Sequence, residues 1–245
     1  MTVELVLLIL GAYLLGAVPA AFLVAKWSRG IDLRQYGSGN VGASNLLRLT
    51  SKWLAIPVII FDLGKGMIMV WTAQLLGLGI AQQVTVGLAA IVGHNWSVFL
   101  RFVGGRGVLT TLGLALILPV INNVVPWGIV VLAVIAVTGI FIIHNVPLGV
   151  GCGIASLPLV SWGFGEPLPL TLGYLAMFLL LVIRRLATPQ TSVSASVSLG
   201  QLLLNRLLFD RDIRDREAWI HRVALQASSE QTLREEEKQG KVNDK

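Results

Sequence analysis

The sequence is poor in cysteine and in charged residues, and both shortages restrict its class. Cys152 is the only cysteine among 245 residues, so an intrachain disulfide is impossible and a structural zinc ion would lack thiolate partners. Charged residues make up only 13% of the chain, whereas apolar residues make up 55% and the mean hydropathy is +0.76. A soluble domain of this composition would need an implausibly large core. We therefore expect the lipid bilayer to surround most of the chain, and we expect no nucleic-acid partner.

The few charges are concentrated toward the C-terminus. Residues 184–245 hold 11 of the 19 basic residues and 9 of the 13 acidic ones. This shift predicts a membrane domain over 1–187, a flexible Ser/Thr-rich linker over 188–198, a possible amphipathic helix over 199–225 and a disordered charged tail over 226–245. The apolar spacing of that helix fits a position along the membrane surface, and equally a solvated helix docked on the loops.

Apolar runs long enough to cross a membrane recur along the chain. About 20 residues at 1.5 Å rise span the ~30 Å hydrocarbon layer. The candidate spans are 3–25, 53–76, 79–100, 108–125, 127–146, 148–164 and 168–183. The first carries Glu4 instead of basic residues at its start and is too long for a signal peptide, so we expect it to remain as a span. The predicted fold class is an all-α polytopic membrane protein with about seven spans.

Basic residues alternate between the loops. The loops after the first, third and seventh spans carry basic residues, whereas those near 77–83, 119–127 and 163–167 carry none. By the positive-inside rule, loops that carry Lys and Arg stay in the cytoplasm. The N-terminus is therefore predicted outside and the C-terminus inside, with the glycine-rich basic motifs on the cytoplasmic face.

The first of these motifs lies at 37–48 and combines glycine with short polar side chains. Its candidate phosphate ligands are Gly37, Ser38, Gly39, Asn40, Gly42, Asn45 and Arg48. Glycines let backbone N–H groups turn toward an anion, Ser and Asn add neutral donors, and arginine supplies a planar fork for phosphate. The Gly-Lys-Ser/Thr ending of a Walker loop and a flanking strand are both missing. The alternative is a flexible re-entrant turn whose arginine meets lipid headgroups.

The second motif ends the third span with Gly104, Gly105, Arg106 and Gly107, before a helix predicted from about residue 108. The N-terminal amides and positive dipole end of that helix would face a bound anion, with Arg106 at the mouth of the site. His94 lies earlier in the same motif. It is a candidate general base, and alternatively a hydrogen-bonded packing residue.

The third motif places Asp62 and Lys65 inside an apolar span. Unpaired charge at that depth costs about 2.5–3.5 kcal/mol per residue, so the two side chains, on one helix face at i and i+3, should pair or line a polar cavity. A structural ion pair is one interpretation, and Lys65 reaching toward a phosphate is the other. Gly149 and Gly153 form a small-xxx-small pair, which predicts close helix packing.

Four segments in this order resemble the PlsY family of bacterial glycerol-3-phosphate acyltransferases: Leu15–Pro19, 37–48, Asp62–Gly66 and 93–108. The resemblance covers about 5–185. It implies seven spans in the bacterial inner membrane, an outside N-terminus and an active site at the cytoplasmic face. It also implies transfer of an acyl group from acyl-phosphate to the sn-1 hydroxyl of glycerol-3-phosphate, giving lysophosphatidate and phosphate. Because acyl-phosphate has a good leaving group, we expect no cofactor and no metal.

The resemblance also assigns individual residues. Ser38 and Arg48 match the family's phosphate-binding positions, and Arg106 stands where the family usually has lysine. The family's Val-Ser-Leu-Ala-Ser pattern is replaced by Val146–Val150, which has neither hydroxyl. Its third motif, His-x-x-Asn-Ile-x-Arg-Leu, does not directly follow the last span, and the nearest echo is Leu204–Leu208.

Two other functions are compatible with the same residues. One is a catalytically silent paralogue that binds a phosphorylated lipid precursor or a partner, because the third motif is degenerate. The other is a transporter of small anions, with Asp62 and Lys65 on its pathway. No inverted repeat is visible between the two halves of the sequence, which counts against transport.

Overall fold

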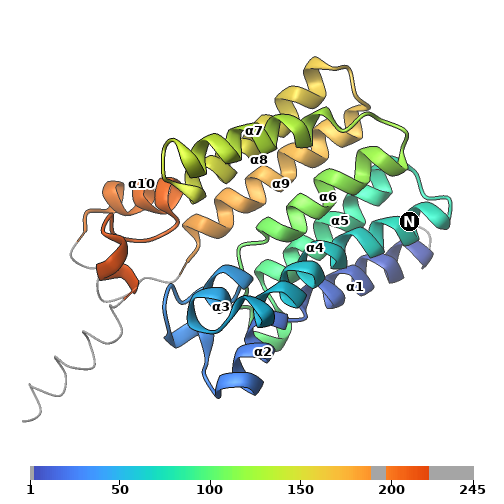
Figure 1. Ribbon diagram of the computed structural model, residues 1–245. Helices are drawn as coiled ribbons and strands as arrows, with labels where there is room; N and C mark the ends of the chain where they lie inside the picture. The colour runs from blue at the N-terminus through green and yellow to red at the C-terminus, as the bar shows by residue number, and fades with distance from the viewer. Residues whose placement is uncertain (1–2, 189–196, 221–245) are drawn as a thin grey trace, which may run out of the picture.

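The chain forms a bundle of α-helices, seen here in a computed structural model (Figure 1). The structure describes residues 3–188 and 197–220, and no strand occurs among them. Most of the predicted linker, at 189–196, and the predicted tail at 226–245 lie outside the described residues. The helices are α1 (Val3–Ala17), α2 (Ala20–Arg29), the 3-10 turn η1 (Leu33–Gln35), α3 (Ala43–Leu49), α4 (Lys52–Leu75), α5 (Ile80–Asn95), the 3-10 turn η2 (Val98–Leu100), α6 (Val108–Ile121), α7 (Trp127–Phe141), α8 (Val146–Gly163), α9 (Leu168–Leu186) and α10 (Leu199–Phe209).

The predicted all-α membrane fold is confirmed, but two of the seven predicted spans are short. Within the described residues, the segments long and apolar enough to cross a membrane are Val3–Arg29, Lys52–Leu75, Ile80–Leu100, Val146–Gly163 and Leu168–Leu186. The spans predicted over 108–125 and 127–146 correspond to α6, with 14 residues, and α7, with 15. Helix α6 ends because the chain turns at Asn123, which has a positive φ of 56°. An exact number of seven spans stays a prediction.

Close contacts between backbones hold the helices together. A Cβ atom on Gly16 of α1 would overlap the backbone of Ala90 on α5, so these helices approach more closely than any larger residue would permit. Helices α7 and α8 meet in the same way, with Gly149 against Gly139 and Gly153 against Leu132. The close packing predicted for Gly149 and Gly153 is therefore confirmed. Small residues serve this purpose because dispersion between closely packed helices replaces the hydrophobic effect in lipid.

The first membrane segment is broken between α1 and α2. Pro19 has no N–H to continue the helical hydrogen bonds, so the chain changes direction at this point. The carbonyl oxygen of Leu15 accepts the N–H of Val18 at 3.2 Å, and that of Ala17 accepts a hydrogen bond from the Ser97 hydroxyl at 2.5 Å. Helix α2 then leads to the glycine-rich loop before α3, at the end of the bundle opposite the N-terminus (Figure 1).

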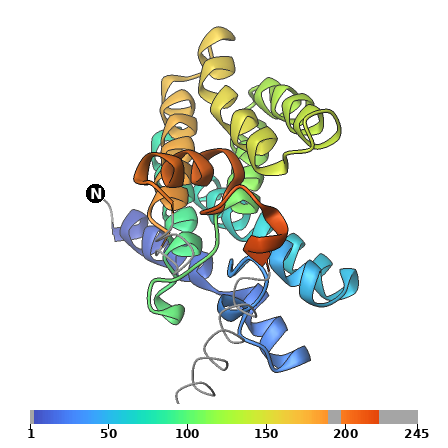
Figure 2. The same ribbon diagram turned by 90° about the vertical axis from the view of Figure 1, so that its left-hand side faces the viewer.

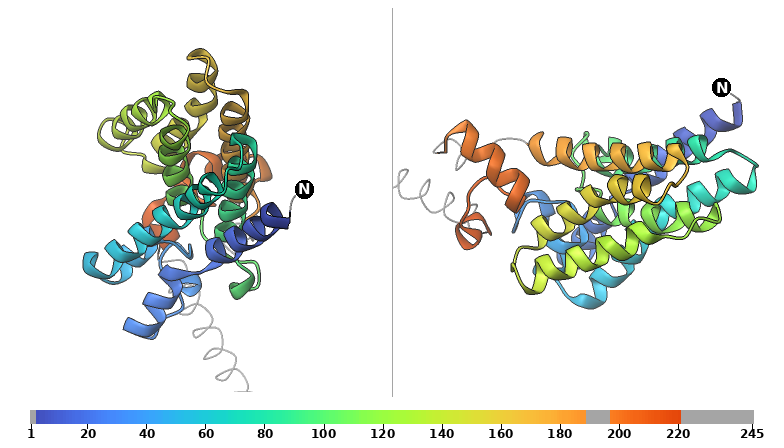
Figure 3. Two further views of the ribbon diagram at one scale, coloured as in Figure 1. Left: turned by 90° about the vertical axis from the view of Figure 1, so that its right-hand side faces the viewer. Right: turned by 90° about the horizontal axis from the view of Figure 1, so that it is seen from above.

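Helix α10 crosses that same end of the bundle, where it contacts α8 and α9 (Figures 2 and 3). It stops at Phe209 because Asp210 adopts a left-handed conformation with φ 56°, and the described residues become helical again at 216–220. Arg206 anchors the helix from a buried position. Its Nε atom lies 2.7 Å from Oδ1 of Asp212, and its Nη1 atom donates to the carbonyl of Leu186 at 2.7 Å. The described part of the predicted helix at 199–225 is thus docked on the bundle.

Candidate functional site

The glycine-rich segment 37–48 folds around one buried side chain, Asn45. Its amide nitrogen donates to three carbonyl oxygens, those of Leu33 at 3.2 Å, Tyr36 at 3.0 Å and Asn40 at 3.1 Å. Its amide oxygen accepts the N–H of Ser38 at 3.0 Å. These bonds occupy the amide, so the structure shows Asn45 shaping the loop, and the direct phosphate contact predicted for it stays a prediction.

Two glycines let the same loop turn tightly around Asn45. Gly37 and Gly39 have φ values of +58° and +73°, a region that L side chains rarely adopt. A Cβ on Gly37 would also overlap the amide oxygen of Asn45. With the loop turned in this way, Ser38 and Asn40 line the cavity described next.

A cavity of about 720 Å³ opens at this end of the bundle. Its walls come from four parts of the chain: the glycine-rich loop, α3, the turn before α8, and the segment after α10. Its polar lining residues are Ser38, Asn40, Ser44, Arg48, His144, Asn145, Asp210, Arg211 and Arg216. Burial and the positive charge of Arg216 lower the pKa of Arg48, which as an arginine remains cationic at neutral pH. The cavity is therefore polar and cationic on one side, as a site for a phosphorylated ligand requires.

In the second glycine-rich segment, at 104–107, the glycines are packed against the end of α5. A Cβ on Gly104 would overlap the carbonyl oxygens of His94 and Asn95, and one on Gly105 would overlap the ring of His94. Gly107 has a φ of +71° and lies against the Asn95 side chain. All three glycines are buried. Their presence is explained by this packing, and the phosphate contacts predicted for them stay predictions.

Arginine side chains hold the second segment in place. Arg184 of α9 donates from Nη2 to the Gly104 carbonyl at 2.8 Å and from Nε to the Gly105 carbonyl at 2.9 Å. Arg106 donates from Nη1 to Thr188 Oγ1 at 2.5 Å, and its Nε atom lies 3.0 Å from Oδ1 of Asp210. Arg106 does not line the large cavity, but its partner Asp210 does.

Three polar side chains are buried beneath these loops, where α4 meets α5. Nζ of Lys65 lies 2.8 Å from Oδ1 of Asp62 and 2.7 Å from Nδ1 of His94. The predicted pairing of Asp62 with Lys65 is therefore confirmed. An ammonium group on Lys65 can only donate, so Nδ1 of His94 would be the acceptor in this contact.

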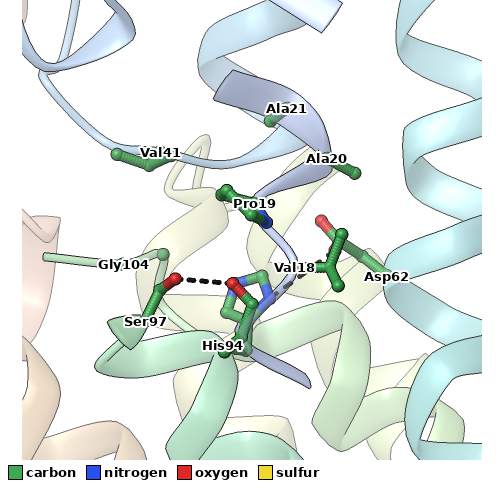
Figure 4. A pocket seen from close by; sticks show the side chains of 11 residues that line it. Val18, Pro19, Ala20, Ala21, Val41, Asp62, His94, Ser97 and Gly104 are labelled. Carbon is green, nitrogen blue, oxygen red and sulfur yellow. Dashed lines mark hydrogen bonds and ion pairs between the residues drawn. The ribbon is translucent and has the colours of Figure 1, made fainter. Parts of the chain in front are cut away.

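The surroundings of His94 favour the packing interpretation. Its side chain is 9% exposed and lines only a small cavity of about 10 Å³, room for about one water molecule. Figure 4 shows His94 and Asp62 meeting beside the break at Val18 and Pro19. Neither His94 nor Lys65 lines the large cavity. A general-base role for His94 and a phosphate contact for Lys65 stay predictions.

Several site residues lie at the end of α9 or after it and were not singled out from the sequence. Arg184 and Arg185 are in the last turn of α9, and both guanidinium groups bind carbonyl oxygens of distant segments. Arg185 donates to Pro147 at 2.7 Å and to Leu207 at 2.6 Å, so it joins α8, α9 and α10. Arg211 and Arg216 also reach the cavity. The only signal in the sequence was the high density of arginine after residue 183.

The helical bundle and the cationic cavity at its end define a class: a membrane protein with a polar, arginine-lined cavity where its helices end. Residues 6–192 match the family described as glycerol-3-phosphate acyltransferase. The chain belongs to the glycerol-3-phosphate acyltransferase family.

Relatives and solved structures agree with that assignment. Glycerol-3-phosphate acyltransferase 5 of Dehalococcoides mccartyi (strain ATCC BAA-2266 / KCTC 15142 / 195) is 41% identical, over 93% of this chain and 97% of the relative. Glycerol-3-phosphate acyltransferase 4 of Dehalococcoides mccartyi (strain CBDB1) is 42% identical, over 88% and 93%. The crystal structure of PlsY (YgiH), an integral membrane glycerol 3-phosphate acyltransferase in its glycerol 3-phosphate form, is similar with a TM-score of 0.65 and 31% identity. That alignment covers 74% of this chain and 88% of the solved one.

Proposed function

We propose that this protein is a membrane acyltransferase that moves a fatty acyl group from acyl-phosphate to glycerol-3-phosphate. The sn-1 hydroxyl oxygen attacks the acyl carbon, and the bond from that carbon to the phosphate oxygen breaks. The hydroxyl proton passes to the departing phosphate, and lysophosphatidate and inorganic phosphate are released. The observation that carries the proposal is the cavity of about 720 Å³ in which Ser38 and Arg48 lie together. The family supports it, and a similar solved structure is described in a glycerol 3-phosphate form and in a lysophosphatidic acid form.

The residues at the cavity suit this reaction because acyl-phosphate is already activated. The enzyme then has to position two phosphorylated substrates and neutralise their charge, which fixed donors and cations do well. Arg48 provides a planar fork for one phosphate, and Ser38 and Asn40 add neutral donors beside it. We propose that Arg106 takes part by exchange, with a substrate phosphate replacing the carboxylate of Asp210 on its guanidinium group.

The proposal includes a topology. The chain crosses the bacterial inner membrane seven times, with its N-terminus outside and the cavity facing the cytoplasm. Two observations support this. The N-terminus and the cavity lie at opposite ends of the bundle (Figure 1), and the basic loops are gathered at the cavity end. At 1.5 Å per residue, α6 and α7 are only about 21–23 Å long, so local thinning of the bilayer or burial against neighbouring helices accompanies them.

An assay of phosphate release tests the enzymatic proposal. Purified full-length protein in detergent receives acyl-phosphate with and without glycerol-3-phosphate, and both phosphate and lysophosphatidate are measured. We expect both products in equal amounts and only when glycerol-3-phosphate is present. A folded protein that releases no phosphate under these conditions contradicts the proposal and favours the silent paralogue, which the loss of both hydroxyls at Val146–Val150 would then explain. Acyl-coenzyme A in place of acyl-phosphate is the control for donor specificity.

A further inference from the structure

Three arginines from two distant parts of the chain line the same cavity. Arg48 ends α3, whereas Arg211 and Arg216 follow α10. Because α10 docks on α8 and α9, Arg211 and Arg216 reach the same cavity as Arg48. The positive charge of Arg216 acts on both of the others: together with burial, it lowers the pKa of Arg48 and of Arg211. Like charges repel one another, so an anion bound at this wall of the cavity would be stabilised.

Among the residues that the structure describes, the carboxylate that lines the same cavity belongs to Asp210, and it is paired with Arg106. Within the described residues, none of the three guanidinium groups is in an ion pair, whereas Arg106 and Arg206 each have a carboxylate partner. Nε of Arg211 is buried and has no hydrogen-bond partner. Asp215 and Glu217 are the nearby acidic groups and only partly offset the charge of Arg211 and Arg48. The cluster therefore keeps unused donors and unbalanced charge at the wall of a cavity.

The chain on both sides of Arg211 is fixed, so its position is built into the fold. Asp210 precedes it and lies 3.0 Å from Nε of Arg106, and Asp212 follows it and lies 2.7 Å from Nε of Arg206. The Arg211 guanidinium also stands over the ring of Phe209 at 5.2 Å. Two anchored neighbours and an aromatic support hold the side chain before any ligand binds.

We propose that Arg211 and Arg216 bind, together with Arg48, a phosphate group of a substrate, which makes the segment after α10 part of the active site. This inference rests on the proposed function. Guanidinium groups recognise phosphate with paired, charge-assisted hydrogen bonds, and a cluster of three matches the several oxygens of one phosphate. Both substrates of the proposed reaction carry such a group, and the experiment separates them.

The experiment compares Arg211→Gln and Arg216→Gln with Arg214→Gln. Arg214 is exposed and does not line the cavity, so it is the matched control. We expect Arg211→Gln and Arg216→Gln to raise the KM of one substrate by about tenfold or more with a smaller change in kcat, and Arg214→Gln to change neither. A higher KM for glycerol-3-phosphate alone assigns the cluster to the acceptor, and a higher KM for acyl-phosphate alone assigns it to the donor. Unchanged KM values for both substrates in folded Arg211→Gln and Arg216→Gln overturn the inference.

A binding measurement keeps this test separate from the test of activity. If the wild type releases no phosphate with glycerol-3-phosphate, the proposed function fails, but the cluster can still be judged. Glycerol-3-phosphate and inorganic phosphate should each raise the thermal unfolding temperature of the full-length wild type, because a ligand bound only by the folded form stabilises it. The rise should persist in Arg214→Gln and disappear in Arg216→Gln, whose exposed side chain is not needed for folding. Equal stabilisation of all variants overturns the inference.

Discussion

The two glycine-rich segments resemble each other in sequence but have different surroundings in the structure. In the first, at 37–48, the glycines turn the chain around Asn45 and leave Ser38 and Arg48 at a cavity. In the second, at 104–107, the glycines are buried because His94 and Asn95 leave no room for a side chain. Glycine thus serves two separate purposes, a tight turn of the backbone beside a cavity and close contact with a helix end. A glycine-rich basic motif by itself does not distinguish them.

The two segments also differ in the charge of the side chains that hold them in place. A neutral amide, Asn45, holds the first from inside, so no charge is consumed there and Arg48 stays free of carboxylate partners within the described residues. The second is held from outside by the guanidinium of Arg184, and its own Arg106 is paired with Asp210. We therefore expect substitutions in the first segment to act mainly on catalysis, and those in the second mainly on stability.

The largest effect should come from Arg48→Ala. Removing a charged donor from a preorganised site costs about 2.7–4 kcal/mol of transition-state stabilisation, so kcat/KM should fall by about 10²–10³-fold. The unfolding temperature should hardly change, because the side chain is exposed. Kinetics of phosphate release and thermal unfolding in detergent measure the two quantities. Arg29→Ala, at the end of α2 and away from the cavity, is the control. Wild-type activity in Arg48→Ala would contradict a catalytic role for the first segment.

Gly104→Ala tests the structural side of the comparison. The added methyl group would overlap two backbone carbonyl groups, which cannot move aside as a flexible side chain can. Overpacking costs about 1–3 kcal/mol, and we expect the upper end of that range for the free energy of unfolding. Gly64→Ala on α4 is the matched control, because nothing lies within 4 Å of its added carbon. If the two variants have equal unfolding temperatures, packing does not explain the second segment.

Arg106 belongs to the second segment, but in the proposed function it binds a substrate phosphate, as Arg48 of the first segment does. If a substrate phosphate replaces Asp210 on this residue, Arg106→Ala should lower turnover by about 100-fold, and Arg106→Lys should keep most of the activity because it keeps the charge. Rates of phosphate release at saturating substrate measure this. Asp210→Asn distinguishes a role of Arg106 in binding substrate from a role in holding the fold, because it removes the pairing carboxylate and leaves Arg106 in place. A loss of stability in both Arg106→Ala and Asp210→Asn, with unchanged turnover, would make the residue purely structural.

The smallest effect should come from Asp32→Asn, at the entrance of the first segment. The hydrogen bond from Arg34, 2.6 Å from Oδ2, holds the pKa of Asp32 below its usual value. The stabilisation is therefore present above the ordinary carboxyl pKa and is lost as the pH falls through the lower folded value. Because the pair is partly exposed, it contributes about 0.5 kcal/mol. The variant keeps an oxygen to cap η1, so its unfolding temperature should be slightly lower than that of wild type at pH 7. The difference should shrink as the pH falls below the ordinary carboxyl pKa, and a difference that does not change with pH would mean the charge is not its cause.

The parts predicted well from the sequence depend on residues close together in the chain. Apolar runs set the helices, and the i, i+3 spacing of Asp62 and Lys65 is sufficient to pair them. The contacts that build the site join residues about 80 positions apart, such as Arg184 with Gly104. Their acceptors are carbonyl oxygens, which every residue possesses, so no pattern of side chains reveals them. For the same reason the sequence left open whether the helix at 199–225 docks on the loops or lies along the membrane, and Arg211 was not singled out.

Because carbonyl oxygens bind Arg184 and Arg185, these two arginines can affect how fast an anion reaches the protein. Arg184 and Arg185 bind carbonyls, and within the described residues no carboxylate is in an ion pair with either. A carbonyl oxygen is neutral, so folding leaves both positive charges uncancelled near the end of the bundle. Such charges attract anions over about a Debye length, roughly 8 Å at physiological ionic strength. Dissolved salt should therefore slow the encounter with a phosphorylated ligand more than it slows any step that follows binding.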